Sequence, residues 1–375
     1  MQAPEFEYET TFDQSVTENP LVSVIISNYN LERFLEEAID SALHQTYSNV
    51  EVIVVDDGST DDSRRIIAGY GKRIVAVLKV NGGQASACNV GFRASKGEMV
   101  IFLDADDMLL PATVQRVVAA FQSKLGVAKV QYRLQIVNSS AKPTGEFMPA
   151  STSPMPSGDM RHSLIEHGTY TGPATSGNAF AAVVLRRIMP IPENVYRALR
   201  GDGFPDIYLS NLSVMFGQVI SLEKPGGLFR VHGGNNYYRT RGSVDIDSYI
   251  DQWRSEFLAT SDAYIRAKGL LSTMYSVDTS NMKNPYYRDM YRLCQRMISL
   301  KLDRRNHPIR ETPSALFVQG CLLFVSDSNS WSRRLFCLPW LAAMLLAPRP
   351  LSWPLVRALE NARWVRKKLI FLLRR

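Results

Sequence analysis

The chain has 375 residues, of which 45% are hydrophobic and 21% are charged. These values are typical of globular proteins and exclude wholesale disorder, and the length allows either one large domain with appendages or two domains. The net charge of +7 is uneven, because residues 331–375 hold ten Lys and Arg against a single acidic residue, Glu360. The remaining residues are nearly neutral, so we do not expect nucleic acid as a partner.

The N-terminal residues and the cysteines indicate the cellular compartment in which the protein is expected. Residues 1–17 lack both the basic and the apolar part of a secretory signal, so we expect a cytoplasmic protein. The cysteines are scattered without CxxC or metal-like spacing: Cys88, Cys294, Cys321 and Cys337. We therefore expect reduced thiols, with neither a disulfide framework nor a zinc site.

Residues 21–122 alternate short apolar runs with helical patterns, which is typical of a parallel sheet with crossover helices. Four β-branched runs are expected to be strands buried on both faces: Val22–Ile26, Val52–Val55, Ile74–Leu78 and Val100–Leu103. The predicted helices begin at an N-cap at Asn30, after Ser59–Asp62, at about Gln84 and at Pro111, which we expect in the first helical turn.

The second half of the chain gives weaker signals. The run Ala150–Gly158 is loop-like and is expected to be a hinge between two halves of the first domain. Val183–Arg187 and Val219–Leu222 are predicted as strands, and the chain is predicted to be mostly helical after Asp245. Leu335–Pro348 is apolar, but it falls short of the roughly 20 residues that are needed to cross a bilayer.

Polar residues follow three of the predicted strands. They are Ser27–Asn30, Asp56–Ser59 and Asp104–Asp107. Because open α/β sheets bind ligands beyond the carboxyl ends of their strands, we expect these residues to converge. Clustered carboxylates repel one another unless a cation lies among them, and Mg²⁺ or Mn²⁺ commonly bridges carboxylates and substrate phosphates. No GxxxxGK[ST] phosphate loop is present, so the sequence predicts a metal-held diphosphate.

Four motifs in order resemble family 2 glycosyltransferases of the GT-A fold. They are VSVIISNYN at 22–30, VIVVDDGSTDDS at 52–63, NGGQASACNVGF at 81–92 and IFLDADDMLLP at 101–111. The resemblance implies an α/β fold with a doubly wound, mixed, mainly parallel sheet and a helical, basic C-terminal extension. The expected domains are an N-terminal extension (1–20), a GT-A domain (21–240, with a nucleotide-binding half 21–125 and an acceptor half 150–240) and a helical region (245–375).

The resemblance also implies residue roles. For the sugar donor it implies binding by Ser27, Tyr29, Asp57, Asn89 and Asp104. In this set Tyr29 stacks on the base, Asp57 hydrogen-bonds its ring N–H and Asp104 contacts the ribose side. TSGNAF (175–180) is expected near the acceptor.

The metal and the base are implied in the same way. Asp106 would bind Mn²⁺ or Mg²⁺, and His232, in a Phe-Arg-Val-His element, would be a second ligand. Asp206 in PDIYLS resembles the catalytic base of the family, with Asp202 as its rival. The residues leave open that Asp206 only caps a helix and that His232 is a structural histidine.

The function implied by the resemblance is inverting transfer of a hexosyl or N-acetylhexosaminyl group from a nucleotide-diphosphate donor, with UDP favoured. The acceptor would be a hydroxyl of a glycan or lipid-linked acceptor in polysaccharide or glycolipid synthesis. A nucleotidyltransferase is one alternative, although SNYNLERF lacks the Gly-rich basic loop that it predicts. A catalytically decayed, membrane-associated nucleotide-sugar binder is another, because Cys88, Pro205 and Phe229 depart from the family pattern.

The tail from 331 to 375 has a composition of its own. Four of the five tryptophans lie there with the ten basic residues: Trp331, Trp340, Trp353 and Trp364. This mixture is typical of interfacial segments that face anionic lipid, although a protein partner could use the same residues. We expect the tail to seat the protein peripherally on the inner face of the cytoplasmic membrane.

Overall fold

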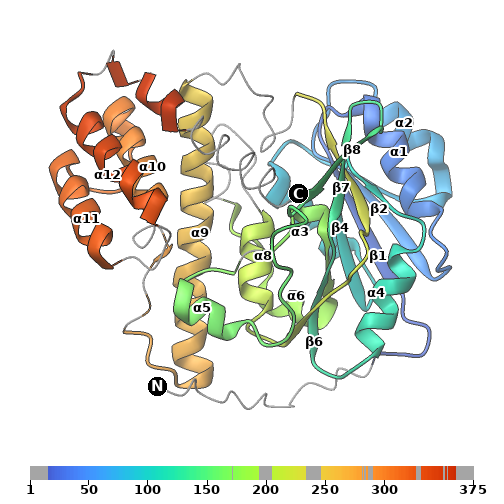
Figure 1. The fold of residues 1–375 in the computed structure, drawn as a ribbon. Helices are drawn as coiled ribbons and strands as arrows, with labels where there is room; N and C mark the ends of the chain where they lie inside the picture. Colours follow the sequence, from blue (N-terminus) through green and yellow to red (C-terminus); the bar gives the residue numbers. More distant parts are fainter. Residues whose placement is uncertain are drawn as a thin grey trace. The chain divides into compact units, whose positions relative to one another are not determined.

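The structure is a computed structural model. It describes residues 16–170, 172–193, 205–233, 246–280, 282, 284–285, 290–326, 331–348, 351–352 and 354–359. The chain divides into two compact units, Met1–Thr240 with Leu258–Met282 (unit 1) and Arg241–Phe257 with Lys283–Arg375 (unit 2). The long helix α9 (Ile246–Tyr275) contributes residues to both units (Figure 1).

Unit 1 is built on a seven-stranded sheet in the order β10-β6-β9-β4-β1-β2-β3. Its strands are β1 (Val22–Asn28), β2 (Val50–Asp56), β3 (Val75–Leu78), β4 (Met99–Asp104), β6 (Val127–Gln131), β9 (Asn178–Ala181) and β10 (Gln218–Ser221). Strand β9 runs antiparallel to both of its neighbours, and the other pairs are parallel. The predicted mixed, mainly parallel sheet is therefore confirmed.

The strand order creates a switch point at the carboxyl ends of β1 and β4. The chain runs from β1 through β2 to β3 on one side and then returns to β4 on the other side of β1. Ser27 lies in register with Asp104, and Asn28 lies in register with Asp56. Ligands of open α/β sheets bind at such a point, so the sheet itself brings the predicted site residues together.

Helices cover both faces of this sheet. They are α1 (Glu32–Leu43), α2 (Ser63–Tyr70), α3 (Gln84–Ala94), α4 (Thr113–Gln122), α6 (Ala182–Ile188) and α8 (Pro205–Ser213), and α5 (Arg161–His167) is also part of unit 1. Figure 1 shows α1 and α2 on one side of the strands and α3, α6 and α8 on the other. Each helix buries an apolar face, as α1 does with Phe34, Leu35 and Ile39.

A second sheet in unit 1 was not predicted from the sequence. Its order is β5-β11-β7-β8, with β5 (Met108–Leu109), β7 (Leu134–Asn138), β8 (Pro143–Met148) and β11 (Gly227–Val231). Strand β11 pairs with β5, which follows Asp107 directly, so residues 227–231 lie beside the acidic turn after β4. The loop-like run 150–158 follows β8.

Two predicted strands differ in the structure. Val183–Arg187 was predicted as a strand and lies in helix α6, because the buried residues Val184, Leu185 and Ile188 follow a helical spacing. Burial of a helical face outweighs the β propensity of two adjacent valines there. Strand β3 was expected to be buried on both faces, but it is the edge of the sheet, and Val75 and Leu78 are 44% and 53% exposed.

Two predicted helix starts also differ. Asn30 is not the N-cap of α1, because the helix begins at Glu32 and Leu31 is the N-cap. Asn30 has φ +51, in the left-handed region that asparagine tolerates better than most residues. Pro111 does not lie in the first turn of α4, because that helix begins at Thr113 with Ala112 as N-cap.

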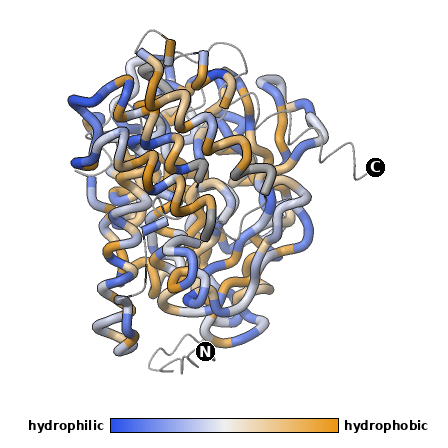
Figure 2. The backbone as a smooth tube through the Cα atoms, turned by 60° about the vertical axis from the view of Figure 1, so that its left-hand side comes forward, coloured by the Kyte–Doolittle hydropathy of each residue, from blue (hydrophilic) through white to orange (hydrophobic). Residues whose placement is uncertain are grey.

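Unit 2 is helical in its described residues. The helices α10 (Met290–Leu302), α11 (Pro313–Ser326) and α12 (Trp331–Leu346) pack on one another around a core of their own. Figure 2 shows hydrophobic residues recurring along the helical segments of the chain. Among the residues that the structure describes, no helix is long and apolar enough to cross a membrane. The segment Trp364–Arg375 lies outside the described residues.

Candidate functional site

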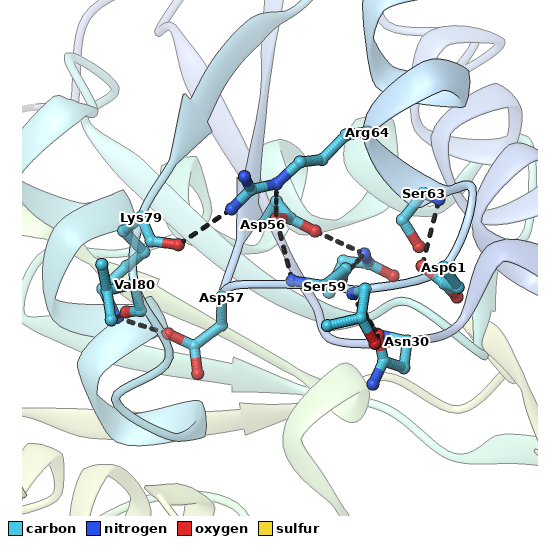
Figure 3. Close-up of polar contacts among 11 residues, drawn as sticks. Asn30, Asp56, Asp57, Ser59, Asp61, Ser63, Arg64, Lys79 and Val80 are labelled. Carbon is cyan, nitrogen blue, oxygen red and sulfur yellow. Dashed lines mark hydrogen bonds and ion pairs between the residues drawn. The ribbon is translucent and has the colours of Figure 1, made fainter.

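The loops after β1 and β2 are joined by a network of hydrogen bonds (Figure 3). The Asn28 amide donates to Asp56 Oδ1 at 3.2 Å and to Ser59 Oγ at 3.1 Å. The backbone N–H of Thr60 donates to Asn30 Oδ1 at 2.7 Å. Burial raises the pKa of Asp56, but hydrogen bonds from Ser59, Arg64 and Asn28 outweigh it and hold the pKa below its usual value. Asp56 is therefore an anionic anchor of this network.

Asp57 is buried and already has several partners in unit 1. It accepts hydrogen bonds from the backbone N–H groups of Gly82 (3.0 Å) and Gly83 (2.7 Å), and it pairs with Lys79. These bonds hold the loop that leads into α3. The contact of Asp57 with a base stays a prediction. Tyr29 is 44% exposed beside this loop network, so its ring is accessible to a ligand.

Ser27 and Asn89 lie on the α3 side of the site. Ser27 Oγ lies 3.7 Å from Cys88 Sγ, and burial raises the pKa of the Cys88 thiol to about 12, so this thiol is neutral. The Asn89 amide accepts from the Ile191 N–H at 2.8 Å and donates to the Ile191 carbonyl at 2.9 Å. Asn89 therefore ties α3 to the segment after α6, and its predicted contact with the sugar donor stays untested.

The acidic turn after β4 meets the end of β11. Asp104 accepts a hydrogen bond from Gln84 Nε2 at 2.6 Å, and Asp106 Oδ2 lies 3.0 Å from His232 Nε2. The buried Arg230 fixes this arrangement, because its Nε donates to the Asp106 carbonyl and its backbone N–H donates to Asp107, both at 2.9 Å. Residues 126 positions apart are thereby brought into contact.

Asp106 Oδ2 and His232 Nε2 lie at hydrogen-bond distance from each other. A carboxylate and an imidazole are both groups that could hold a divalent cation. The described part of the chain holds no group of three or more His, Cys, Asp or Glu residues suited to a metal ion. Mg²⁺ and Mn²⁺ often use one or two protein ligands and take the rest from substrate phosphates and water.

Asp107 follows Asp106 in the chain and is buried. Burial raises the pKa of its carboxyl well above the usual range, and the charges of Asp106 and Asp104 raise it further. A neutral Asp107 reduces the repulsion among the three acidic residues of the turn.

Asp206 lies in the first turn of α8 and is half-buried. Its charge raises the pKa of Cys88, as does the charge of Asp104, so both carboxylates act on the same buried thiol. Asp206 and Asp104 therefore both lie near Cys88 of α3. Its rival Asp202 lies outside the described residues.

Sequence reasoning assigned no role to Lys79, Gln84, Arg230 or Lys129, all of which contact predicted site residues or bury a charge beside them. A signal existed for two of them. Arg230 lies two residues before His232 in the quoted element, and Lys129 is a charge inside the apolar strand VAKVQ. The contacts of Lys79 and Gln84 depend on the fold, and no pattern in the sequence predicts them.

The chain resembles known glycosyltransferases in sequence. Residues 23–180 match the family described as glycosyl transferase family 2. An uncharacterised glycosyltransferase of Nostoc sp. is 37% identical over 222 residues, which are 58% of this chain and 66% of the relative. The uncharacterised glycosyltransferase EpsJ of Bacillus subtilis is 46% identical over 100 residues, 26% of this chain and 29% of the relative. The chain thus spans less than two thirds of the length of these relatives.

Similarity to solved structures is weak. The structure of Staphylococcus aureus TarS 1–349 in complex with UDP-GlcNAc has a TM-score of 0.47 and 16% identity, and the alignment covers 92% of this chain and 91% of TarS 1–349. The family match in residues 23–180 contains three of the four quoted motifs in full and nearly all of the first. Within residues 23–180, the chain thus carries a glycosyl transferase family 2 domain.

Proposed function

We propose that unit 1 is an inverting, metal-dependent glycosyltransferase. Its substrate is a nucleoside-diphosphate sugar, with UDP as the favoured nucleotide and a hexose or N-acetylhexosamine as the sugar. The acceptor is a hydroxyl of a glycan or a lipid-linked acceptor in polysaccharide or glycolipid synthesis. The observation that carries the proposal is the meeting of Asp106 and His232 at 3.0 Å, beside Asp104 at the switch point of the sheet.

The residues around this pair would each bind a different part of the nucleotide sugar or its cation. The exposed ring of Tyr29 offers a stacking surface for the base. Asp104, in register with Ser27, would contact the ribose side. Asp106 and His232 would hold the cation, which supplies Lewis-acid stabilisation of the diphosphate leaving group when it is bound. Arg230, two residues before His232, ties this part of the chain to the Asp106 carbonyl.

In the proposed transfer step, Asp206 acts as the general base. The Asp206 carboxylate takes the proton of the acceptor hydroxyl, and the oxygen attacks the anomeric carbon from the face opposite the diphosphate. The bond between the anomeric carbon and the β-phosphate oxygen breaks, and its electron pair leaves with the nucleoside diphosphate. General-base help is worth about 10²- to 10⁴-fold, so Asp206→Asn is expected to lower kcat on that order.

The sugar-donor site is tested by calorimetry and thermal shift with a panel of nucleotide sugars, with and without Mn²⁺. We expect one nucleotide class to stabilise the wild type in a metal-dependent way. Asp106→Asn should abolish this effect, whereas Asp62→Asn should keep it, because Asp62 is an exposed carboxylate paired with Arg65. If no nucleotide shifts the wild type under any metal condition, the proposal is wrong. Binding without turnover would instead favour the decayed-binder alternative.

We also propose that unit 2 seats the protein on the anionic inner face of the cytoplasmic membrane. Helix α11 contains no charged residue, yet Val318 and Leu322, one turn apart, are 58% and 67% exposed. A helix that is apolar on most sides is usually covered by protein or lipid. Unit 2 also has 20 Lys and Arg against nine Asp and Glu, which suits an anionic lipid surface.

A further inference from the structure

A cavity of about 520 Å³ lies in unit 2 at the carboxyl end of helix α10. The described residues that line it are Lys301–Arg305, which include three basic side chains and one acidic side chain. Its volume falls within the range of about 300 to 1,000 Å³ that is usual for small-ligand sites. The described lining belongs to unit 2 throughout, so this cavity is separate from the candidate site of unit 1.

Two of the four charges on this lining are engaged by the protein itself. Asp303 forms an ion pair with Arg254 of α9. Lys301 Nζ donates to the carbonyls of Leu345 at 3.0 Å and Ala347 at 2.8 Å, at the carboxyl end of α12. These carbonyls carry the negative end of the helix dipole, so Lys301 offsets a charge that would otherwise repel an anion.

Arg304 and Arg305 remain for a ligand. Both are exposed in the short 3₁₀ turn after α10, and within the described part of the chain neither side chain forms an ion pair or a hydrogen bond. An arginine presents two parallel N–H donors to a phosphate, and a phosphomonoester carries about −1.5 to −2 charge at pH 7. The two guanidinium groups therefore match one phosphomonoester in charge and in hydrogen bonding.

Exposed leucines lie next to this basic cavity. Leu346 is 81% exposed and lies between the two residues whose carbonyls bind Lys301 Nζ. Leu351 is 60% exposed, and its N–H donates to the Pro348 carbonyl at 2.9 Å, one residue beyond Ala347. A soluble phosphate gains nothing from these leucines, whereas a lipid can place its phosphate in the cavity and its acyl chains against them.

We propose that this cavity binds the headgroup of a phosphomonoester lipid, with Arg304 and Arg305 on the phosphate and Leu346 beside the acyl chains. The inference rests on the proposed seat of unit 2 on an anionic membrane and adds the class of lipid to it. A surface that responds to charge alone does not distinguish a phosphomonoester from another anionic lipid, whereas two converging arginines do.

The test compares two kinds of phosphatidylcholine vesicle at equal zeta potential. One kind contains phosphatidic acid, a phosphomonoester, and the other contains phosphatidylglycerol, a phosphodiester. In a sedimentation assay the wild type should bind the vesicles with phosphatidic acid about tenfold more tightly. Arg304→Gln with Arg305→Gln should bring this ratio to about one. Arg310→Gln with Arg357→Gln changes two exposed arginines of unit 2 outside the described lining and should keep the tenfold ratio.

A conservative variant separates geometry from charge. Arg304→Lys with Arg305→Lys keeps both charges but loses the planar fork, so it should bind phosphatidylglycerol vesicles like the wild type and lose most of the preference. Equal binding of both vesicle types by the wild type would overturn the cavity assignment and leave the membrane proposal standing. An unchanged preference in the Gln double variant would also overturn it.

Two further results would refute the lipid assignment in different ways. If the wild type binds neither kind of vesicle, the membrane proposal is wrong and the lipid assignment is wrong with it. Calorimetry with glycerol 3-phosphate tests the soluble alternative. If the wild type binds this compound as tightly as vesicles with phosphatidic acid, and the Gln double variant does not, the cavity is a site for soluble phosphomonoesters.

Discussion

At the scale of single residues, Lys129 gives a prediction about stability. Burial lowers its pKa from an ordinary 10.5 to about 7, so between these values the unfolded chain binds the proton more tightly than the folded chain. Linkage then requires the free energy of unfolding to rise with pH across this window, by at most about 1.4 kcal/mol per unit from this one group. Below pH 7 both states bind the proton and the contribution is constant.

Lys129→Met should remove this dependence. We expect urea unfolding from pH 6 to pH 10 to show that the variant is the more stable form at pH 6 and that this advantage shrinks as pH rises. Lys142→Met, which changes an exposed lysine, is the control and should follow the wild type. Parallel curves for the wild type and Lys129→Met would show that the lysine is not strained by burial.

Site residues could be predicted from the sequence where a motif follows a strand. Asp104 ends β4 and Asp106 follows it, and the structure places both at the switch point as expected. The contact between Asp106 and His232 was implied only by the resemblance, because no spacing rule joins residues so far apart. The hydrogen bond from Arg230 to the Asp106 carbonyl was not predicted at all, since it depends on the pairing of β11 with β5.

At the scale of elements, the packing of α3 on the sheet depends on Gly91. A Cβ atom at this position would lie 2.3 Å from Ile25 Cγ2 and 3.2 Å from Val55 Cγ2, both on strands of the sheet. Overpacking of this kind costs about 1 to 3 kcal/mol, so we expect Gly91→Ala to lower the free energy of unfolding by that amount. Thermal or urea unfolding measures the change.

Gly69 in α2 is the matched control for this prediction. A Cβ atom there would meet nothing within 4 Å, so only helix propensity changes, and Gly69→Ala should raise stability by up to about 1 kcal/mol. If Gly91→Ala and Gly69→Ala change the free energy of unfolding in the same way, close contact of α3 with the sheet is not the reason that residue 91 is a glycine. A sugar donor that still binds to Gly91→Ala would show that the site survives a small shift of α3.

Elements were predictable where the hydrophobic pattern was long or continuous. The strands β1, β2 and β4 match buried apolar runs, because central strands of a parallel sheet are covered on both faces. The position of β3 at the edge was not predictable, since it depends on strand order and not on composition. The second sheet was missed because its strands are short and pair over long sequence separations.

At the scale of the whole molecule, charge is divided between the two units. The basic residues concentrate in unit 2, whereas the acidic turn after β4 lies in unit 1. Composition alone predicted the basic tail from residue 331, but the unit to which it belongs also takes in residues 241–257, which include the first part of α9 from Ile246 to Phe257. That division could not be predicted, because a continuous helix gives no sequence signal where its neighbours change.

The membrane proposal predicts a specific loss of vesicle binding. The wild type should sediment with phosphatidylcholine vesicles that contain phosphatidylglycerol, and binding should fall at high salt, because the Debye length shortens from about 10 Å at 0.1 M to about 3 Å at 1 M. Val318→Glu with Leu322→Glu should weaken binding at least about tenfold, since burying one such side chain is worth about 1.5 to 3 kcal/mol.

Leu125→Glu is the control, because Leu125 is a 77% exposed leucine of unit 1 and its change adds a negative charge elsewhere. This variant should bind vesicles like the wild type. The remaining explanation is that α11 binds a second copy of the chain. Light scattering after size exclusion tests this explanation, because it measures the molar mass of the protein in solution. If the double α11 variant changes from dimer to monomer while its vesicle binding is unchanged, the apolar face of α11 contacts protein and the membrane proposal is wrong. Loss of vesicle binding at constant mass assigns that face to lipid.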